Sequence, residues 1–135
     1  WFIFSDAEKD VKSSVKNQFT DCNSNKSEMD VVIFLTDGNN FEKQLISDGY
    51  NEEVRKSIIN MEIQKCHNLQ HVEAKKREIA SYDDKKLYEI ITGSNTQYGP
   101  VIAEVIIESK KPLPPKVKEL FEKIKSFLER RDSDE

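Results

Sequence analysis

The sequence contains few of the residues that build tight turns and specialised sites. Its 135 residues include four glycines, four prolines, two cysteines and two histidines. The glycines are scattered, so there is no glycine-rich loop followed by lysine and serine or threonine, which excludes the usual phosphate-binding loop. A Gly-x-Ser-x-Gly segment is also missing, which excludes the nucleophile elbow of many hydrolases. The residue types therefore point away from common nucleotide-binding and hydrolytic chemistry.

Long hydrophobic runs are absent as well, and neither sign of charge dominates. The longest apolar runs, Trp1–Phe4 and Val31–Leu35, are too short to cross a bilayer, so we expect no membrane partner. With 25 acidic and 21 basic residues, the net charge is -4, whereas a dominant nucleic-acid-binding surface usually brings a basic excess. Cys22 and Cys66 form no disulfide framework, and we expect an intracellular protein, cytoplasmic or nuclear. The sequence does not begin with methionine, and we interpret it as a piece of a longer protein.

What the sequence does contain is abundant charge and regularly spaced apolar residues. Charged residues make up 34% of the chain and apolar residues 36%. This length and composition fit one small globular domain. We predict a single domain over residues 1–131 and a frayed acidic tail over residues 132–135.

Four segments favour β-strands. Trp1–Phe4 and Val31–Leu35 are aromatic or β-branched, and the second is apolar on both faces, as in a buried central strand. In Val101–Ile107 every second residue is apolar, which predicts a further strand. Leu87–Ile91 also favours a strand by its β-branched residues. A helix-cap pattern precedes that segment and a glycine follows it, so a short helix is the alternative there.

Other segments carry apolar residues at helical spacing. Ser5 and Glu8 form a capping box that predicts a helix directly after them. Asn39 and Asn51 are the expected caps of two further helices, the second of which is interrupted near residues 66–68. The polar segment Thr20–Asp30 is expected to form an exposed loop.

The clearest helix follows a stiff connector near the end of the sequence. Residues 110–115 contain three prolines and cannot lie inside a helix. After this connector, apolar residues gather on one side of a helix: Val117, Leu120, Phe121, Ile124, Phe127 and Leu128. This apolar side can pack on the chain's own core or dock on a partner.

The order of these elements is roughly β-α-β-α-α-β-β-α. Helices interleaved with strands predict an α+β or α/β domain, with a small mixed sheet of three to four strands covered by helices. An all-α fold is the alternative if the ambiguous segments are helical.

Asp37 follows the best strand of the chain, where α/β folds place ligand-binding groups. The segment Val32–Gly38 resembles a strand of the von Willebrand A family. The metal site of that family also needs an Asp-x-Ser-x-Ser motif after an earlier strand, and segment 5–8 here reads Ser-Asp-Ala-Glu. That metal motif is therefore absent, and a turn residue is the alternative interpretation of Asp37.

Cys66, His67 and His71 form a cluster of metal-binding residue types. The two histidines lie one helical turn apart and can share a zinc ion. A site would still need a third and fourth ligand, and Cys22 would have to arrive through folding. We therefore expect no metal ion, no cofactor and no catalytic residues.

Residues 31–80 carry a second resemblance. Its elements are the strand before Asp37-Gly38, the pairs Leu45-Ile46 and Gly49-Tyr50, and then Leu69 and Glu73-Ala74-Lys75-Lys76. This spacing is similar to the second half of staphylococcal-nuclease-like domains, including those attached to Tudor domains. The catalytic arginine, aspartate and glutamate of that family lie largely in segments without a match here. The resemblance implies a non-catalytic, binding version of such a domain.

Seven basic residues form two clusters of positive charge in the sequence. These candidate residues for binding nucleic acid or a protein partner are Lys75, Lys76, Arg77, Lys110, Lys111, Lys116 and Lys118. No aromatic residues are interleaved with them as a stacking platform for bases. Solvated helix faces with pairs of opposite charge are the alternative explanation.

From these observations we expect a non-catalytic protein-interaction or scaffold module of a larger protein, with a protein partner. The alternative is a domain that binds RNA or single-stranded DNA through its basic helix faces. A third hypothesis is a metal-dependent enzyme with Asp37 at its site. The sequence indicates no oligomeric state.

Overall fold

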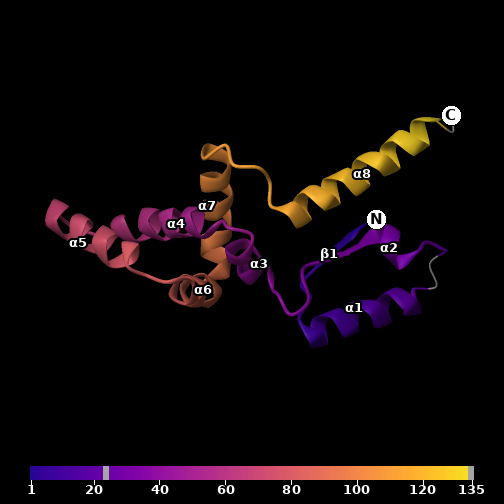
Figure 1. Cartoon of the computed structure of the whole chain (residues 1–135), viewed down its shortest axis with the longest axis horizontal. Helices are drawn as coiled ribbons and strands as arrows, with labels where there is room; N and C mark the ends of the chain where they lie inside the picture. Colours follow the sequence, from indigo (N-terminus) through magenta and orange to yellow (C-terminus); the bar gives the residue numbers. More distant parts are fainter. Residues whose placement is uncertain (23–24, 134–135) are drawn as a thin grey trace. The chain divides into compact units, whose positions relative to one another are not determined.

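The computed structural model describes residues 1–22 and 25–133, which form eight helices and two strands (Figure 1). The strands are β1 (Ile3–Ser5) and β2 (Val32–Phe34). The helices are α1 (Lys9–Asp21), α2 (Glu28–Val31), α3 (Phe41–Ser47), α4 (Asn51–Ile63), α5 (Leu69–Ala80), α6 (Asp84–Gly93), α7 (Asn95–Glu108) and α8 (Pro115–Ser133). The chain is mostly helical, so the predicted sheet of three to four strands covered by helices is wrong. In this described part, no helix is both long and apolar enough to cross a membrane.

Contacts divide the chain into two compact units. Trp1–Gln44 and Leu113–Glu135 form one, which we call the sheet unit, and Leu45–Pro112 form the other, the helical unit. This division does not test whether the two units unfold together, so the single domain over residues 1–131 stays a prediction. Of the tail predicted over residues 132–135, positions 132 and 133 belong to α8, and 134 and 135 lie outside the described residues.

Two short parallel strands form the centre of the sheet unit. Ile3 lies opposite Val32, and Ser5 lies opposite Phe34. Parallel strands need a crossover connection, which α1 and α2 supply. Both strands fall close to the segments predicted for them. The sheet ends there, because the two strands pair only with each other in the described part of the chain.

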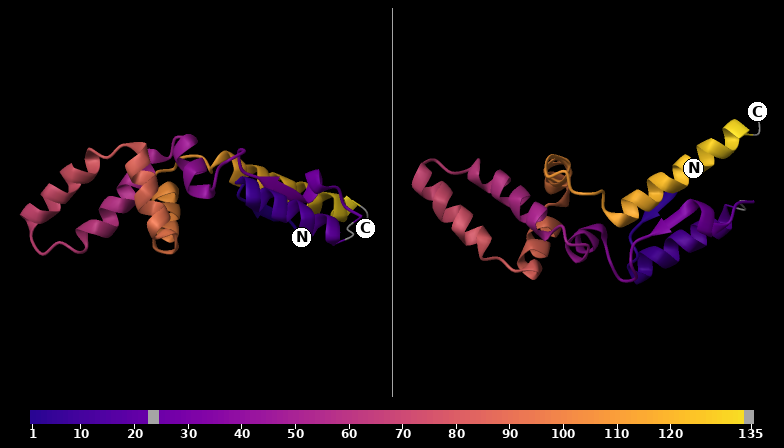
Figure 2. Two further views of the ribbon diagram at one scale, coloured as in Figure 1. Left: turned by 90° about the horizontal axis from the view of Figure 1, so that it is seen from below. Right: turned by 45° about the horizontal axis from the view of Figure 1, so that its top comes forward.

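Helices α1 and α8 cover opposite faces of this small sheet (Figures 1 and 2). The ring of Trp1 packs on Phe19 of α1, with 6.0 Å between ring centroids. The next residue, Phe2, packs on Phe127 of α8 at 5.9 Å. Neighbouring residues of an extended chain point to opposite faces, so these two contacts place the helices on either side.

The helical unit packs α5, α6 and α7 against α4. Its core is almost completely buried. The following core side chains are at most 2% exposed: Val54, Ile58, Ile79, Leu87, Ile91 and Val105. They come from all four helices, so no single pair of helices carries the core.

The segment Leu87–Ile91 lies in α6 and not in a strand. Asp83 caps this helix, because its carboxylate accepts a hydrogen bond from the Lys86 backbone N–H at 2.8 Å. Leu87 and Ile91 are four residues apart and are both fully buried, which a helix achieves with one face. The helical alternative for this segment is therefore confirmed.

The segment Val101–Ile107 is also helical and forms half of α7, so the strand predicted there is wrong. Tyr98, Ile102, Val105 and Ile106 are all at most 6% exposed, at a spacing that only a helix places on one face. Ile107, which the strand prediction placed on the buried face, is 74% exposed. Helix α7 forms despite an internal proline, which costs it a backbone hydrogen bond.

Three of the predicted helix caps are wrong in position, and one of them is Asn51, which is the first residue of α4 and follows Tyr50 at the cap position. Ser5 belongs to β1, and α1 begins after Glu8 without a side-chain cap. Asn40, not Asn39, caps α3, because its side chain accepts from the Lys43 backbone N–H at 3.0 Å. The predicted loop 20–30 contains the end of α1 and most of α2, and residues 23 and 24 of that loop lie outside the described residues.

Candidate functional site

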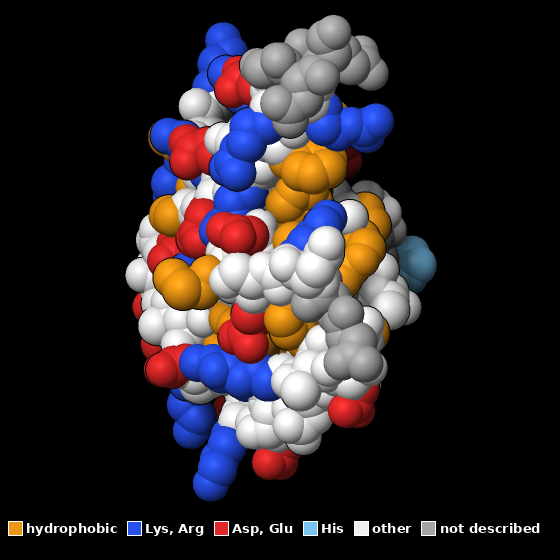
Figure 3. Space-filling view, turned by 90° about the vertical axis from the view of Figure 1, so that its right-hand side faces the viewer, with side chains coloured by type: hydrophobic (Ala, Val, Ile, Leu, Met, Phe, Trp, Pro, Cys, Tyr) orange, Lys and Arg blue, Asp and Glu red, His pale blue; other side chains and the backbone are white. Residues whose placement is uncertain are grey.

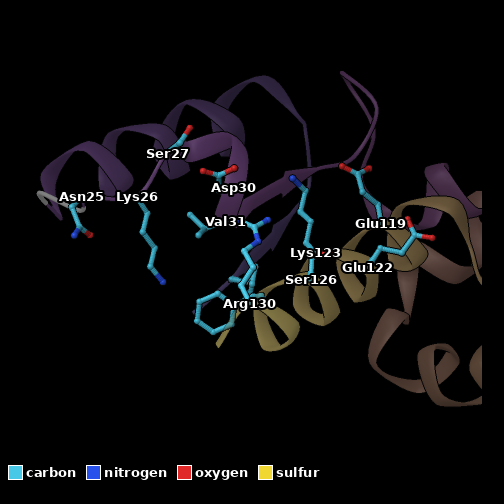
Figure 4. A pocket seen from close by; sticks show the side chains of 12 residues that line it. Asn25, Lys26, Ser27, Asp30, Val31, Glu119, Glu122, Lys123, Ser126 and Arg130 are labelled. Atoms are coloured by element: carbon cyan, nitrogen blue, oxygen red, sulfur yellow. The ribbon is translucent and has the colours of Figure 1, made fainter. Parts of the chain in front are cut away.

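A groove of about 480 Å³ lies in the sheet unit between α8 and the segment around α2 (Figure 4). We call it the α2–α8 groove. Phe2, Val31 and Phe127 supply its apolar lining. Around them lie charged and hydroxyl-bearing or amide side chains: Asn25, Lys26, Ser27, Asp30, Glu119, Glu122, Lys123, Ser126 and Arg130.

The aromatic part of the groove is a packed pair of rings. The rings of Phe2 and Phe127 meet edge to face, at an angle of 84° between their planes. This geometry is favourable for two phenyl rings. The ammonium of Lys26 lies 5.2 Å from the centroid of Phe127, so a cation already rests on this ring. Phe127 still exposes 37% of its surface, which leaves room for a further contact.

Lys123 ties the two sides of the groove together. Its ammonium donates a hydrogen bond to the backbone carbonyl of Met29 in α2, at 2.6 Å. A short helix leaves its last carbonyls without partners inside the helix, and this lysine satisfies one of them. The contact holds α2 beside α8 and so sets the width of the groove.

The charges around the groove balance. Lys26, Lys123 and Arg130 face a matching number of acids, Asp30, Glu119 and Glu122. Figure 3 likewise shows lysine, arginine and acidic side chains interspersed on one face of the molecule, with hydrophobic ones between them. A surface built for a polyanion gathers one sign of charge. The α2–α8 groove therefore matches a ligand that carries both signs or few charges.

The basic residues predicted as a binding site belong to both units. In the helical unit, Lys75 pairs with Glu78 at 2.7 Å and Lys76 with Glu73 at 3.2 Å. Arg77 is exposed, and no carboxylate lies within 4.0 Å of it in the part of the chain that the structure describes.

The predicted residues at the end of the helical unit have different surroundings. Lys111 pairs with Glu53 at 3.1 Å, donates to the backbone carbonyl of Gly49, and lies 4.6 Å from the centroid of the Tyr50 ring. It thus fastens the segment after α7 to the start of α4. Lys110 is exposed and has a positive φ of 55°.

Lys116 and Lys118 lie on α8 in the sheet unit. Lys116 pairs with Glu119 at 3.3 Å, and Lys118 pairs with Glu122 at 3.9 Å. Five of the seven predicted residues therefore have a carboxylate partner within 4.0 Å. These acids place negative charge beside the lysines, which weakens the attraction of a polyanion to them.

Asp37 lies at the carboxyl ends of the two strands, beside a smaller pocket of about 330 Å³. The Gly38 backbone N–H donates to the carbonyl of Ala7, and the Ala7 N–H donates to the carbonyl of Asn39, both at 2.9 Å. These bonds join the loops that follow β1 and β2. Gly38 has a φ of 83°, which a glycine adopts without strain. Asp37 is thus the turn residue before this glycine.

The carboxylate of Asp37 pairs with Lys12 of α1. The hydrogen bond from this lysine, and then its charge, lower the pKa of Asp37 below its ordinary value. Among the described residues there is no group of three or more histidines, cysteines or acids that could hold a metal ion, either here or at Cys66, His67 and His71.

We expect replacement of Asp37 by asparagine to reduce the loss of folding stability that the wild type shows as the pH falls from about 7 to about 3. A lowered folded pKa means that the ion pair stabilises the fold above the unfolded pKa of about 3.9, and that this stabilisation is lost as pH falls through the folded pKa. The effect is small because the carboxylate is exposed. The measurement is the urea midpoint from Trp1 fluorescence between about pH 3 and pH 7. Asp10→Asn removes an equal charge from the surface of α1, and identical profiles for both variants would contradict the prediction.

Sequence reasoning found only one part of the α2–α8 groove. The apolar side of α8 contains Phe127, and its spacing was visible in the sequence. Phe2 and the residues around α2 carry no local pattern that points to a site. They join α8 because the two strands bring both ends of the sheet unit together.

No protein-family model matches the chain, and no curated protein and no solved structure matches it significantly. The resemblance of residues 31–80 to staphylococcal-nuclease-like domains therefore stays a prediction, as does that of Val32–Gly38 to the von Willebrand A family.

Proposed function

We propose that the chain is a non-catalytic protein-interaction module of a larger intracellular protein, and that it binds a short segment of a partner protein in the α2–α8 groove. The observation that carries this proposal is the partly exposed aromatic pair beneath a charge-balanced rim. Protein interfaces concentrate their binding energy where an apolar side chain enters a pocket of this kind, with polar groups around it.

The chemistry of the groove suggests what the partner segment carries. An aromatic or aliphatic side chain can cover Phe127, which is 37% exposed. Asp30 and Arg130, on the two sides of the groove, can pair with a cation and an anion that flank this side chain (Figure 4). We therefore expect a segment with one large apolar residue between charges of opposite sign.

RNA or single-stranded DNA is a weaker match for the same chain. Asp30, Glu119 and Glu122 would repel phosphates in the groove. The predicted basic residues outside the groove are mostly paired with acids, as described above. Binding of nucleic acid in the groove would therefore contradict the proposal.

A selection from a phage-displayed library of random peptides tests the proposal. Peptides selected on the chain are expected to share a large apolar residue with charged neighbours. Their affinity, measured by fluorescence polarisation, is expected to fall about tenfold or more for Arg130→Glu. The matched control is Arg131→Glu, which reverses the same charge in the same helical turn but does not line the groove.

Two results would overturn the proposal. One is that selected peptides bind Arg130→Glu and Arg131→Glu equally well. The other is that the chain binds a generic RNA with an affinity that falls steeply with salt and is indifferent to Arg130→Glu.

A further inference from the structure

Helix α8 has a second exposed apolar surface, separate from the groove. Phe121 and Leu128 are 54% and 52% exposed and line no part of the α2–α8 groove. They are seven residues apart, which is about two helical turns, so they lie on the same side of α8. We call this side the outer edge of α8.

The outer edge exists because the apolar side of α8 is wider than its contact with the sheet. Leu120 and Ile124 are half-buried at the centre of that contact. Phe121 lies between these two residues along the helix axis but is turned about 100° from Leu120 around it, so the side of α8 that packs on the sheet leaves Phe121 exposed.

Charges of alternating sign follow the outer edge. Along the helix they are Lys118, Glu122, Lys125 and Glu129. In each pair the lysine lies one turn before its glutamate. The distance is 3.9 Å between Lys118 and Glu122 and 3.7 Å between Lys125 and Glu129, and all four side chains are at least 65% exposed. Such pairs contribute little to the stability of the helix itself.

We infer that the outer edge of α8 binds the same edge of a second copy of this chain, with the two helices antiparallel. A two-fold axis that passes between residues 124 and 125 places Phe121 opposite Leu128 of the second copy. In this register Lys118 lies within one turn of Glu129 of the second copy, and Glu122 within one turn of Lys125.

The charge pattern selects this partner and this orientation. In a two-fold pair both copies share one register, and a sequence of plus, minus, plus and minus is then complementary to itself only when one copy is reversed. The same four side chains would meet their like charges in a parallel pair in register. The apolar contact is small, so we expect a weak dimer that depends on concentration. The two surfaces share Glu122, which also lines the groove, but the inference does not rest on the function proposed for the groove.

Sedimentation equilibrium of the 135-residue chain tests the inference directly. The mass is expected to rise from 15.7 kDa towards twice that value as the protein concentration approaches about 1 mM. The variant Phe121→Ser with Leu128→Ser is expected to stay monomeric and to keep the helical content of the wild type in circular dichroism, because both side chains are exposed. The matched control, Met29→Ser with Ile107→Ser, removes two exposed apolar side chains elsewhere and is expected to dimerise like the wild type.

A charge exchange tests the orientation. Lys118→Glu with Lys125→Glu makes the outer edge acidic, and Glu122→Lys with Glu129→Lys makes it basic. Each variant alone is expected to dimerise at least about tenfold more weakly, and an equimolar mixture is expected to recover the affinity of the wild type. The inference is overturned if the wild type stays monomeric over the whole range. It is also overturned if the Phe121 and Leu128 variant dimerises normally, or if the mixture recovers nothing.

Discussion

Replacement of Ile58 by alanine is expected to destabilise the helical unit by about 3 to 4 kcal/mol. Ile58 is 0% exposed and lies on α4, the helix on which α5, α6 and α7 all pack. The shorter side chain leaves a cavity in the core of this unit, because the packed side chains around it relax only in part. The loss is a large part of the stability of a small unit.

The matched control for this variant is Ile59→Ala. It makes the same chemical change one position along α4, where the side chain is only half-buried, so its effect is expected to be clearly smaller. Urea unfolding followed by circular dichroism gives the free energy of unfolding for each variant. An Ile58→Ala variant that loses no more stability than Ile59→Ala would contradict the packing described for α4.

The same variant tests the prediction of a single domain over residues 1–131. Trp1 is the only tryptophan of the chain and belongs to the sheet unit, so its fluorescence reports the unfolding of that unit. If both units unfold together, Ile58→Ala shifts the fluorescence and circular dichroism transitions alike. If they unfold separately, the fluorescence transition stays where it is in the wild type.

Replacement of Arg55 by alanine is expected to cost about 2 to 3 kcal/mol. One nitrogen of its guanidinium donates hydrogen bonds to three backbone carbonyls, at 2.8 Å to Ile79, 3.3 Å to Ala80 and 2.8 Å to Tyr82. These carbonyls lie at and just beyond the end of α5, where a helix leaves its own acceptors unpaired. The ion pair of Arg55 with Glu52 involves an exposed carboxylate and adds little.

Two further variants separate the hydrogen bonds from the charge. Arg55→Lys keeps the positive charge but replaces the planar guanidinium by a single ammonium. It is expected to restore less than half of the stability that Arg55→Ala loses. Arg77→Ala removes an exposed arginine from the last turn of α5 and is expected to stay within about 0.5 kcal/mol of the wild type. Urea unfolding measures all three, and equal losses for Arg55→Ala and Arg77→Ala would show that the carbonyl contacts are unimportant.

Local chemistry made part of the fold predictable. The proline connector and the long apolar spacing after it led to α8, and Gly49 ends α3 with the positive φ expected of a terminating glycine, 88°. The gap between α4 and α5 also falls where it was predicted, because Asn68 caps the second helix by accepting from the His71 backbone N–H. Each of these features depends on residues within one or two turns of each other.

Val101–Ile107 shows why the remaining fold was not predictable. The same run of valines, isoleucines and alanine has an apolar face at a period of two and another at a helical period that begins with Tyr98. The helical face packs on α4, and burial of Ile102, Val105 and Ile106 there outweighs the cost of Pro100. Residues 54 and 58, far away in the sequence, thus helped to decide the local conformation.

The candidate site divides in the same way. Lys75 and Lys76 could be read from the sequence as paired with acids three residues away, Glu78 and Glu73, because those partners lie on the same helix. The α2–α8 groove could not be found this way. Phe2 and Phe127 form it together although they stand near opposite ends of the chain.

By itself the sequence determined the helix α8, the strands near residues 3 and 32, the connector before α8 and the missing phosphate-binding and nucleophile motifs. Tertiary structure alone decided that Val101–Ile107 is helical, that the sheet has two strands, and that α8 exposes an outer edge beside a groove. The reason is that caps, turns and same-helix charge pairs are local interactions. Burial, in contrast, depends on which surfaces meet, and distant parts of the chain supply those surfaces.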